Sequence, residues 1–106
     1  MKEIFLLKEG GILNLTLRWE VIKMDELNNL RKKVDKLDSE LLNILKRRLI
    51  LSKEISRFKR KNGLKILDKK REKEVLQNKI KKSSLNGRFV KELFSLILCE
   101  SRRIQK

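Results

Sequence analysis

The chain has 106 residues, enough for one small domain whose apolar core is limited, so an oligomer is expected. It contains no proline and no histidine, and its single cysteine, Cys99, excludes an intramolecular disulfide and disfavours a zinc site. The net charge of +15 fits three interpretations: solvated helix faces, a nucleic-acid partner, or a small substrate that carries several negative charges.

Aromatic residues and long apolar runs are both scarce. Four phenylalanines and one tryptophan supply few surfaces on which nucleic-acid bases could stack. No apolar run approaches the roughly 18 residues that span a bilayer. Lys8, Glu9 and two glycines interrupt the first apolar stretch, so a signal peptide is not expected and a cytoplasmic location is predicted.

Residues 1–23 form an N-terminal extension with its own periodicity. An apolar run at 4–7 is followed by Gly10 and Gly11, and then apolar residues alternate strictly with polar ones over 13–21. Alternation of period two predicts a strand, and the two glycines suggest a hairpin. A loosely ordered extension is the alternative, and Met24 is a second candidate for the start of translation.

From Met24 the periodicity becomes helical. Apolar residues recur at alternating steps of three and four, which defines a heptad seam: Leu27, Leu30, Val34, Leu37, Leu41, Ile44, Leu51, Ile55 and Phe58. The helix is expected to end at Asn62 and Gly63, after about 55 Å. A helix of that length with an apolar seam needs its partner on another chain.

Two shorter helices follow. Asp68 is a candidate N-cap of the second helix, whose apolar stripe contains Val75, Leu76 and Ile80. A turn over 83–87 precedes a third helix that extends to Gln105. The predicted fold class is therefore all-α, with one very long helix and two shorter ones, in a domain that spans 24–106.

Arg48 interrupts the heptad seam between Ile44 and Leu51. An unpaired guanidinium there would be costly, so it calls for an anion. A structural pair with a carboxylate of a partner helix, or a side chain that reaches outward to solvent, accounts for it equally well. Lys59 lies eleven residues further on, close to three helical turns, and shares the Arg48 face.

Five more polar residues fall at helical spacings. Asp68, Arg71 and Glu72 stand at i, i+3 and i+4, which by itself favours a capped, salt-bridged helix start. Ser101 and Gln105 stand four apart below an apolar stripe, a pattern that a solvated helix end also gives. Together with Arg48 and Lys59 they describe a pocket with cations, two carboxylates and neutral hydrogen-bonding groups.

From residue 27 to 105 the chain resembles the all-α chorismate mutase family. The resemblance rests on Leu30-Arg31-Lys32-Lys33-Val34-Asp35-Lys36-Leu37-Asp38, Leu41-Leu42, Arg47-Arg48, Lys59, Asp68-Lys69-Lys70-Arg71-Glu72, Phe94, Glu100-Ser101 and Gln105. The family often has a proline just before the second helix, where this chain has Lys65-Ile66-Leu67, and residues 1–23 have no counterpart in it.

The resemblance implies an intertwined homodimer that converts chorismate to prephenate without a cofactor or a metal, in the biosynthesis of phenylalanine and tyrosine. It implies four catalytic residues: Arg48, Lys59, Glu72 and Gln105. It implies eight substrate-binding residues: Arg31, Arg48, Lys59, Asp68, Arg71, Glu72, Ser101 and Gln105.

Each residue has an implied role. Arg48 and the Arg31 of the other subunit would clamp the two substrate carboxylates, and Lys59 and Gln105 would donate to the ether oxygen. Glu72 and Asp68 would accept hydrogen bonds from the ring hydroxyl or nearby backbone. Ser101 would assist at a carboxylate, and Arg71 would complete the cationic wall.

Two rival functions remain at this point. An isochorismate-pyruvate lyase shares the fold and a similar cationic pocket. A basic helical protein that binds nucleic acid is the rival without enzymatic activity, and steep loss of duplex binding with salt would favour it.

Overall fold

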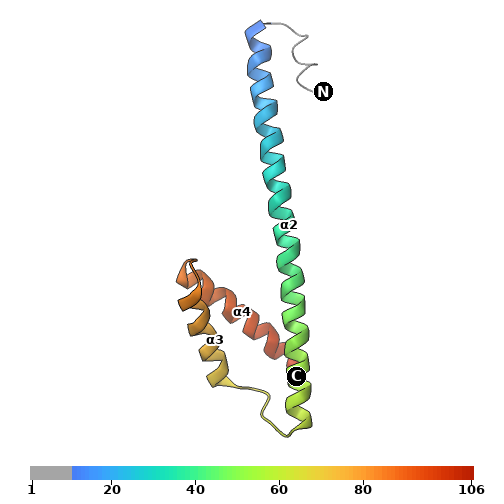
Figure 1. Cartoon of the computed structure of the whole chain (residues 1–106), viewed down its shortest axis with the longest axis vertical. Coiled ribbons are helices and arrows are strands. Elements are labelled where there is room, and N and C mark those ends of the chain that lie inside the picture. Colours follow the sequence, from blue (N-terminus) through green and yellow to red (C-terminus); the bar gives the residue numbers. More distant parts are fainter. Residues whose placement is uncertain (1–10) are drawn as a thin grey trace. The chain divides into compact units, whose positions relative to one another are not determined.

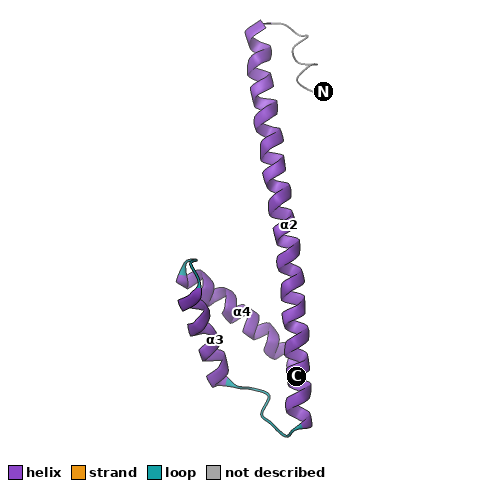
Figure 2. Ribbon diagram, viewed as in Figure 1, coloured by secondary structure: helices purple, strands orange, loops and turns teal. Residues whose placement is uncertain are grey.

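The computed structural model describes residues 11–106. They form three helices, α2 (Gly11–Lys61), α3 (Lys69–Lys82) and α4 (Gly87–Gln105), and no strand occurs over that range (Figure 1; Figure 2). The all-α prediction of one long helix and two shorter ones is confirmed. The chain divides into two compact units, Met1–Asn43 and Ile44–Lys106, which are described separately below.

The predicted strand over 13–21 is wrong, because α2 is already helical from Gly11. Leu17 and Val21 belong to the alternating run, but they also lie four apart, which places them on one helix face. With no proline in the chain, nothing breaks the helix before its natural end. The apolar run at 4–7, the other half of the predicted hairpin, lies outside the described residues. None of the described helices is both long enough and apolar enough to cross a membrane.

Gly63 ends α2, as the sequence predicts. Its φ is +67°, a left-handed conformation that favours glycine. The amide of Leu64 donates to the carbonyl of Lys59 at 2.8 Å, and the amide of Gly63 donates to the carbonyl of Arg60 at 3.3 Å. This pair of bonds is the Schellman arrangement, which satisfies carbonyls left open at a helix end.

Side-chain caps begin the two shorter helices. Asp68 caps α3 by accepting the amide of Arg71 at 2.9 Å, which confirms its predicted cap role. Asn86 caps α4 by accepting the amide of Phe89 at 3.0 Å. Residues 83–86 connect the two helices into a hairpin (Figure 1), so the predicted turn is confirmed, with Gly87 as the first helical residue after it.

Within Ile44–Lys106, small hydroxyl side chains lie where α2 meets α4. Val75, Val90 and Leu98 supply the buried apolar side chains of α3 and α4. On α2 the buried side chains are Ser52 and Ser56, the latter only 1% exposed. Ser52 Oγ lies 3.3 Å from Ser101 Oγ, so α2 contacts α4 through this small hydroxyl side chain, while the apolar seam stays exposed.

The heptad seam of α2 is exposed in both units, as far as the structure describes the chain. Every apolar seam residue from 27 to 58 is at least 38% exposed, and Phe58 is 63% exposed. A contiguous apolar stripe of this length is unusual on the surface of a monomer. The stripe supports the predicted need for a partner chain, which remains a prediction.

The helix end at Gly63 gives a stability prediction. We expect Gly63→Ala to lower the free energy of unfolding by about 1 kcal/mol, because an L-residue is strained at positive φ. A Cβ at this position would meet nothing within 4 Å, so the cost is conformational and not steric. Urea unfolding at a fixed protein concentration measures it.

Gly87→Ala is the matched control. Its Cβ would lie 3.6 Å from Ile80 Cγ2, an ordinary contact, at a position without positive φ. We expect it to leave stability unchanged or slightly raised. Equal losses for both variants would contradict the strain argument.

Candidate active site

A cavity of about 160 Å³ opens between α2, α3, α4 and the loop before α3, all within Ile44–Lys106. Seven of the eight predicted substrate-binding residues line it: Arg48, Lys59, Asp68, Arg71, Glu72, Ser101 and Gln105. Residues from three helices and a loop thus converge on one pocket, although they are spread over almost sixty positions of sequence. Arg31, the eighth, belongs to Met1–Asn43 and is not among the lining residues, so its role in the site of another subunit stays a prediction.

The α2 wall of the pocket carries two cations with neutral partners. Arg48 is half-buried, and its Nη1 donates to Ser101 Oγ at 3.1 Å. Lys59 Nζ donates to the carbonyl oxygen of Ile66 at 3.1 Å. Among the described residues, no carboxylate forms an ion pair with either side chain. Both positive charges are therefore available to an anionic ligand.

A network of hydrogen bonds fixes the α4 wall against α2. Ser52 Oγ donates to Ser101 Oγ at 3.3 Å, and Ser101 Oγ donates to the carbonyl of Ile97 at 2.9 Å. Gln105 Nε2 donates to the carbonyl of Ser52 at 3.0 Å. Since Arg48 donates to the same Ser101 hydroxyl, this group joins both walls. The Gln105 amide is held at the pocket by its hydrogen bond to the backbone of α2.

The α3 wall supplies two carboxylates and a third cation. Asp68 is engaged as the helix cap, and Arg71 contacts Glu74 at 4.0 Å in an exposed pair. Glu72 Oε1 forms an ion pair with Arg102 Nη1 at 2.5 Å. The carboxylates of this wall thus have partners of their own and leave the α2 cations uncompensated.

Sequence analysis did not identify five of the cavity-lining residues as part of the site, nor Arg102, which pairs with one of the lining residues. Ser52, Ile55, Ile66, Val75 and Leu98 complete the cavity wall. Ser52 and Ile55 could have been found, since they continue the spacing of Arg48 and Lys59 along α2. Arg102, the partner of Glu72, follows Leu98 by four residues on the same α4 face, but spacing alone does not reveal its partner on α3.

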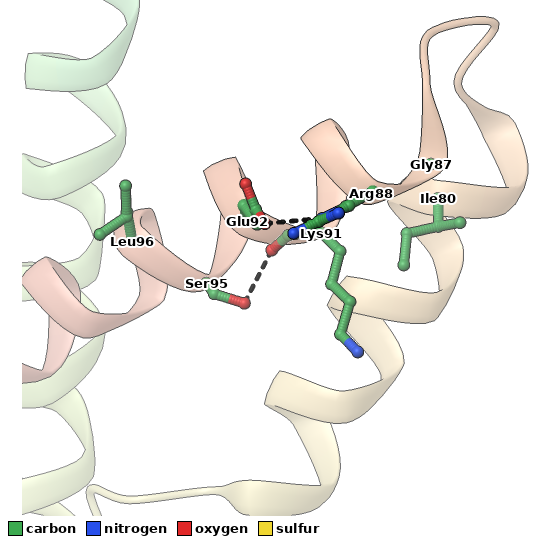
Figure 3. Close-up of a pocket in the computed structure, with 7 residues that line it drawn as sticks. All are labelled: Ile80, Gly87, Arg88, Lys91, Glu92, Ser95 and Leu96. Atoms are coloured by element: carbon green, nitrogen blue, oxygen red, sulfur yellow. Dashed lines mark hydrogen bonds and ion pairs between the residues drawn. The ribbon is translucent and has the colours of Figure 1, made fainter.

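A larger hollow of about 850 Å³ lies between the end of α3 and the start of α4 (Figure 3). Its cations are Arg88 and Lys91, and Arg88 Nε contacts Glu92 Oε1 at 3.2 Å. Ser95 Oγ donates to the carbonyl of Lys91 at 2.7 Å, as the dashed line in Figure 3 shows. None of the predicted site residues lines this hollow, so the smaller cavity remains the candidate active site.

Beyond the pocket, an exposed ion pair joins two neighbouring turns of α4. Arg103 Nε donates to Glu100 Oε1, and this hydrogen bond lowers the pKa of the Glu100 carboxyl. Neither residue lines the cavity. An exposed pair of this kind contributes little to stability.

Comparison with known proteins points to one family. Residues 30–106 match the family described as chorismate mutase type II. The chorismate mutase of Methanocaldococcus jannaschii is 24% identical over 86 residues, which cover 78% of this chain and 87% of that protein. A solved structure, chorismate mutase (form II) from Thermus thermophilus, superposes with a TM-score of 0.71 at 30% identity and covers 76% of this chain and 93% of its own.

Two longer relatives carry a second activity in their names. The bifunctional chorismate mutase/prephenate dehydratase of Aquifex aeolicus is 37% identical over 71 residues, 65% of this chain. Its counterpart from Buchnera aphidicola (subsp. Acyrthosiphon pisum) is 37% identical over 89 residues, 81% of this chain. The matches cover 20% and 21% of those proteins, so this chain spans about a fifth of their length.

Substitution can separate the cap acceptor of Asp68 from its negative charge. Asp68→Ala should lower the free energy of unfolding by about 1 kcal/mol, because the Arg71 amide loses its acceptor. Asp68→Asn keeps an acceptor oxygen, and its free energy of unfolding should lie within about 0.5 kcal/mol of the wild-type value, since asparagine caps as well as aspartate. Thermal and urea unfolding of both variants measure the difference, and an equal loss in Asn and Ala would show that the charge, not the cap, stabilises α3.

Proposed function

Since the chain belongs to the chorismate mutase type II family, we propose that it converts chorismate to prephenate in the biosynthesis of aromatic amino acids. The observation that carries the proposal is the pair of pocket cations, Arg48 and Lys59, whose hydrogen-bond partners are neutral. Chorismate is a dianion, and such a pocket complements two carboxylates. A cytoplasmic location is part of the same proposal.

The proposed reaction is a unimolecular 3,3-sigmatropic (Claisen) rearrangement, in which one C–O bond breaks as one C–C bond forms. No proton moves and no covalent intermediate is needed, so the side chains present are sufficient and no cofactor is proposed. The first task of the protein is to hold the enolpyruvyl arm over the ring in a chair-like geometry. Arg48, with Ser101 beside it, is proposed to clamp one carboxylate for that purpose.

The second task is to stabilise negative charge that grows on the ether oxygen as its bond lengthens. Lys59 and Gln105 are the proposed donors, and both are positioned by hydrogen bonds to backbone carbonyls. Glu72 and Asp68 are proposed to accept from the ring hydroxyl or nearby backbone. Arg71 completes the cationic wall.

We further propose that the chain acts as a homodimer whose long helices pair antiparallel. The exposed heptad seam supports pairing, because it is an apolar stripe that no described part of the chain covers. Arg31 directly follows the seam residue Leu30, which puts it at the margin of such an interface. In this proposal Arg31 of each subunit binds the second carboxylate in the site of the other.

The direct test is the loss of chorismate absorbance on incubation with the purified protein, with prephenate identified as the product. A parallel incubation with isochorismate, followed by detection of pyruvate, distinguishes a lyase. Turnover of isochorismate without turnover of chorismate would replace the proposed function with the lyase. Salt-sensitive binding of duplex nucleic acid without turnover of either substrate would reject both enzymes.

Arg48→Ala tests the assignment of the site. We expect kcat/KM to fall about 100-fold or more, because a charge-assisted donor to substrate is removed, while the helical content stays that of the wild type. Arg57→Ala is the control, since Arg57 is exposed and lies nine residues on, on the opposite face of α2. Circular dichroism and urea unfolding verify that both variants fold. Turnover of a folded Arg48→Ala protein at the wild-type rate would rule out this pocket.

A subunit-exchange experiment tests the crossed site. Neither an Arg31→Ala nor an Arg48→Ala homodimer should turn over chorismate efficiently, but a heterodimer has one site with both arginines intact. With complete exchange, about a quarter of wild-type activity should return, from one good site in half of the dimers. If exchange is demonstrated with labelled subunits and activity does not return, the sites do not cross chains.

A further inference from the structure

We propose that Arg102 is a positioning residue for the proposed reaction: through its ion pair with Glu72 it orients that carboxylate and offsets its charge beside a dianionic substrate. The inference rests on the proposed function. Arg102 does not line the cavity, whereas Glu72 does, so Arg102 would act on the ligand through Glu72.

The geometry gives Glu72 one bound and one available oxygen. Arg102 Nη1 lies 2.5 Å from Glu72 Oε1 and joins α4 to α3 across 30 positions of sequence. In the described part of the chain, no hydrogen bond engages Glu72 Oε2. The ion pair therefore holds one carboxylate oxygen and leaves the second as the acceptor for a substrate hydroxyl.

The charge balance of the pocket explains why the pair matters. Three cations and two carboxylates of this chain line the cavity, Arg31 of the partner subunit is proposed to add a fourth cation, and the proposed substrate brings two more negative charges. An uncompensated Glu72 would repel that substrate, and the repulsion would be felt because the Glu72 side chain is only 24% exposed. Arg102 offsets the charge of Glu72 at short range, and it does so without lining the cavity.

Arg103 gives a natural comparison one residue along the same helix. It pairs with Glu100 in an i,i+3 contact, and the arginine side chain is 72% exposed, against 41% for Arg102. Loss of either arginine removes one positive charge and one ion pair from α4. Only the Arg102 pair reaches a residue that lines the pocket.

The test is a double-mutant cycle of kcat/KM with chorismate. Arg102→Leu should lower kcat/KM about tenfold, largely through a raised KM, because the bound anion already feels the repulsion. Arg103→Leu should stay within about twofold of the wild type. Arg102→Lys, which keeps the charge without the planar fork, should recover part of the loss.

The decisive comparison uses Glu72→Gln as the background. A neutral amide needs no counter-charge, so Arg102→Leu should change kcat/KM by less than about twofold there. The same tenfold loss in both backgrounds would overturn the proposal, and so would wild-type kinetics of the folded Arg102→Leu protein. If Arg102→Leu does not fold, Arg102→Gln replaces it in both backgrounds with the same criteria. A wild-type protein without chorismate turnover would overturn the proposed function itself, together with this inference.

Discussion

The contact between the Ser52 and Ser101 hydroxyls is the point on which the pocket depends. Through this contact two small side chains hold α4 against α2. It also determines where Arg48 and Gln105 lie along the two helices. Arg48 donates to one of these serines and Gln105 to the backbone of the other. A larger side chain at either serine would separate the helices. Arg48 and Gln105 would both be displaced, because the same contact positions both of them.

Two neighbouring faces of α2 have different surroundings. One face, with Arg48, Ser52 and Lys59, lines the pocket within Ile44–Lys106, whereas the neighbouring apolar face remains exposed. Ile55 belongs to both, since it is a seam residue and also lines the cavity. Any chain that covers the seam thus also covers part of the pocket wall, so association and completion of the site would be coupled.

Local chemistry made the helix ends predictable, while tertiary contacts did not follow from spacing. Gly63 and Asp68 end and begin helices through bonds within a few residues, and the sequence contains all that is needed to foresee them. The segment 13–21 misled because leucines that alternate over a short run also fit a helix face. The convergence of seven candidate residues followed from family resemblance, but the pairing of Arg102 with Glu72 depends on how the α3–α4 hairpin packs, which no periodicity encodes.

Lys59 is attached to the segment after α2 at two points. Its carbonyl accepts the amide of Leu64, and its ammonium group donates to the carbonyl of Ile66, two residues before the Asp68 cap. The segment 62–67 is therefore a spacer of fixed length between two walls of the pocket. An inserted or deleted residue there would displace Lys59 from Asp68 even if every side chain were kept, whereas the turn at 83–86 lies at the far end of the hairpin and is free to vary in length. Among homologues, variation in loop length should thus be confined to that turn.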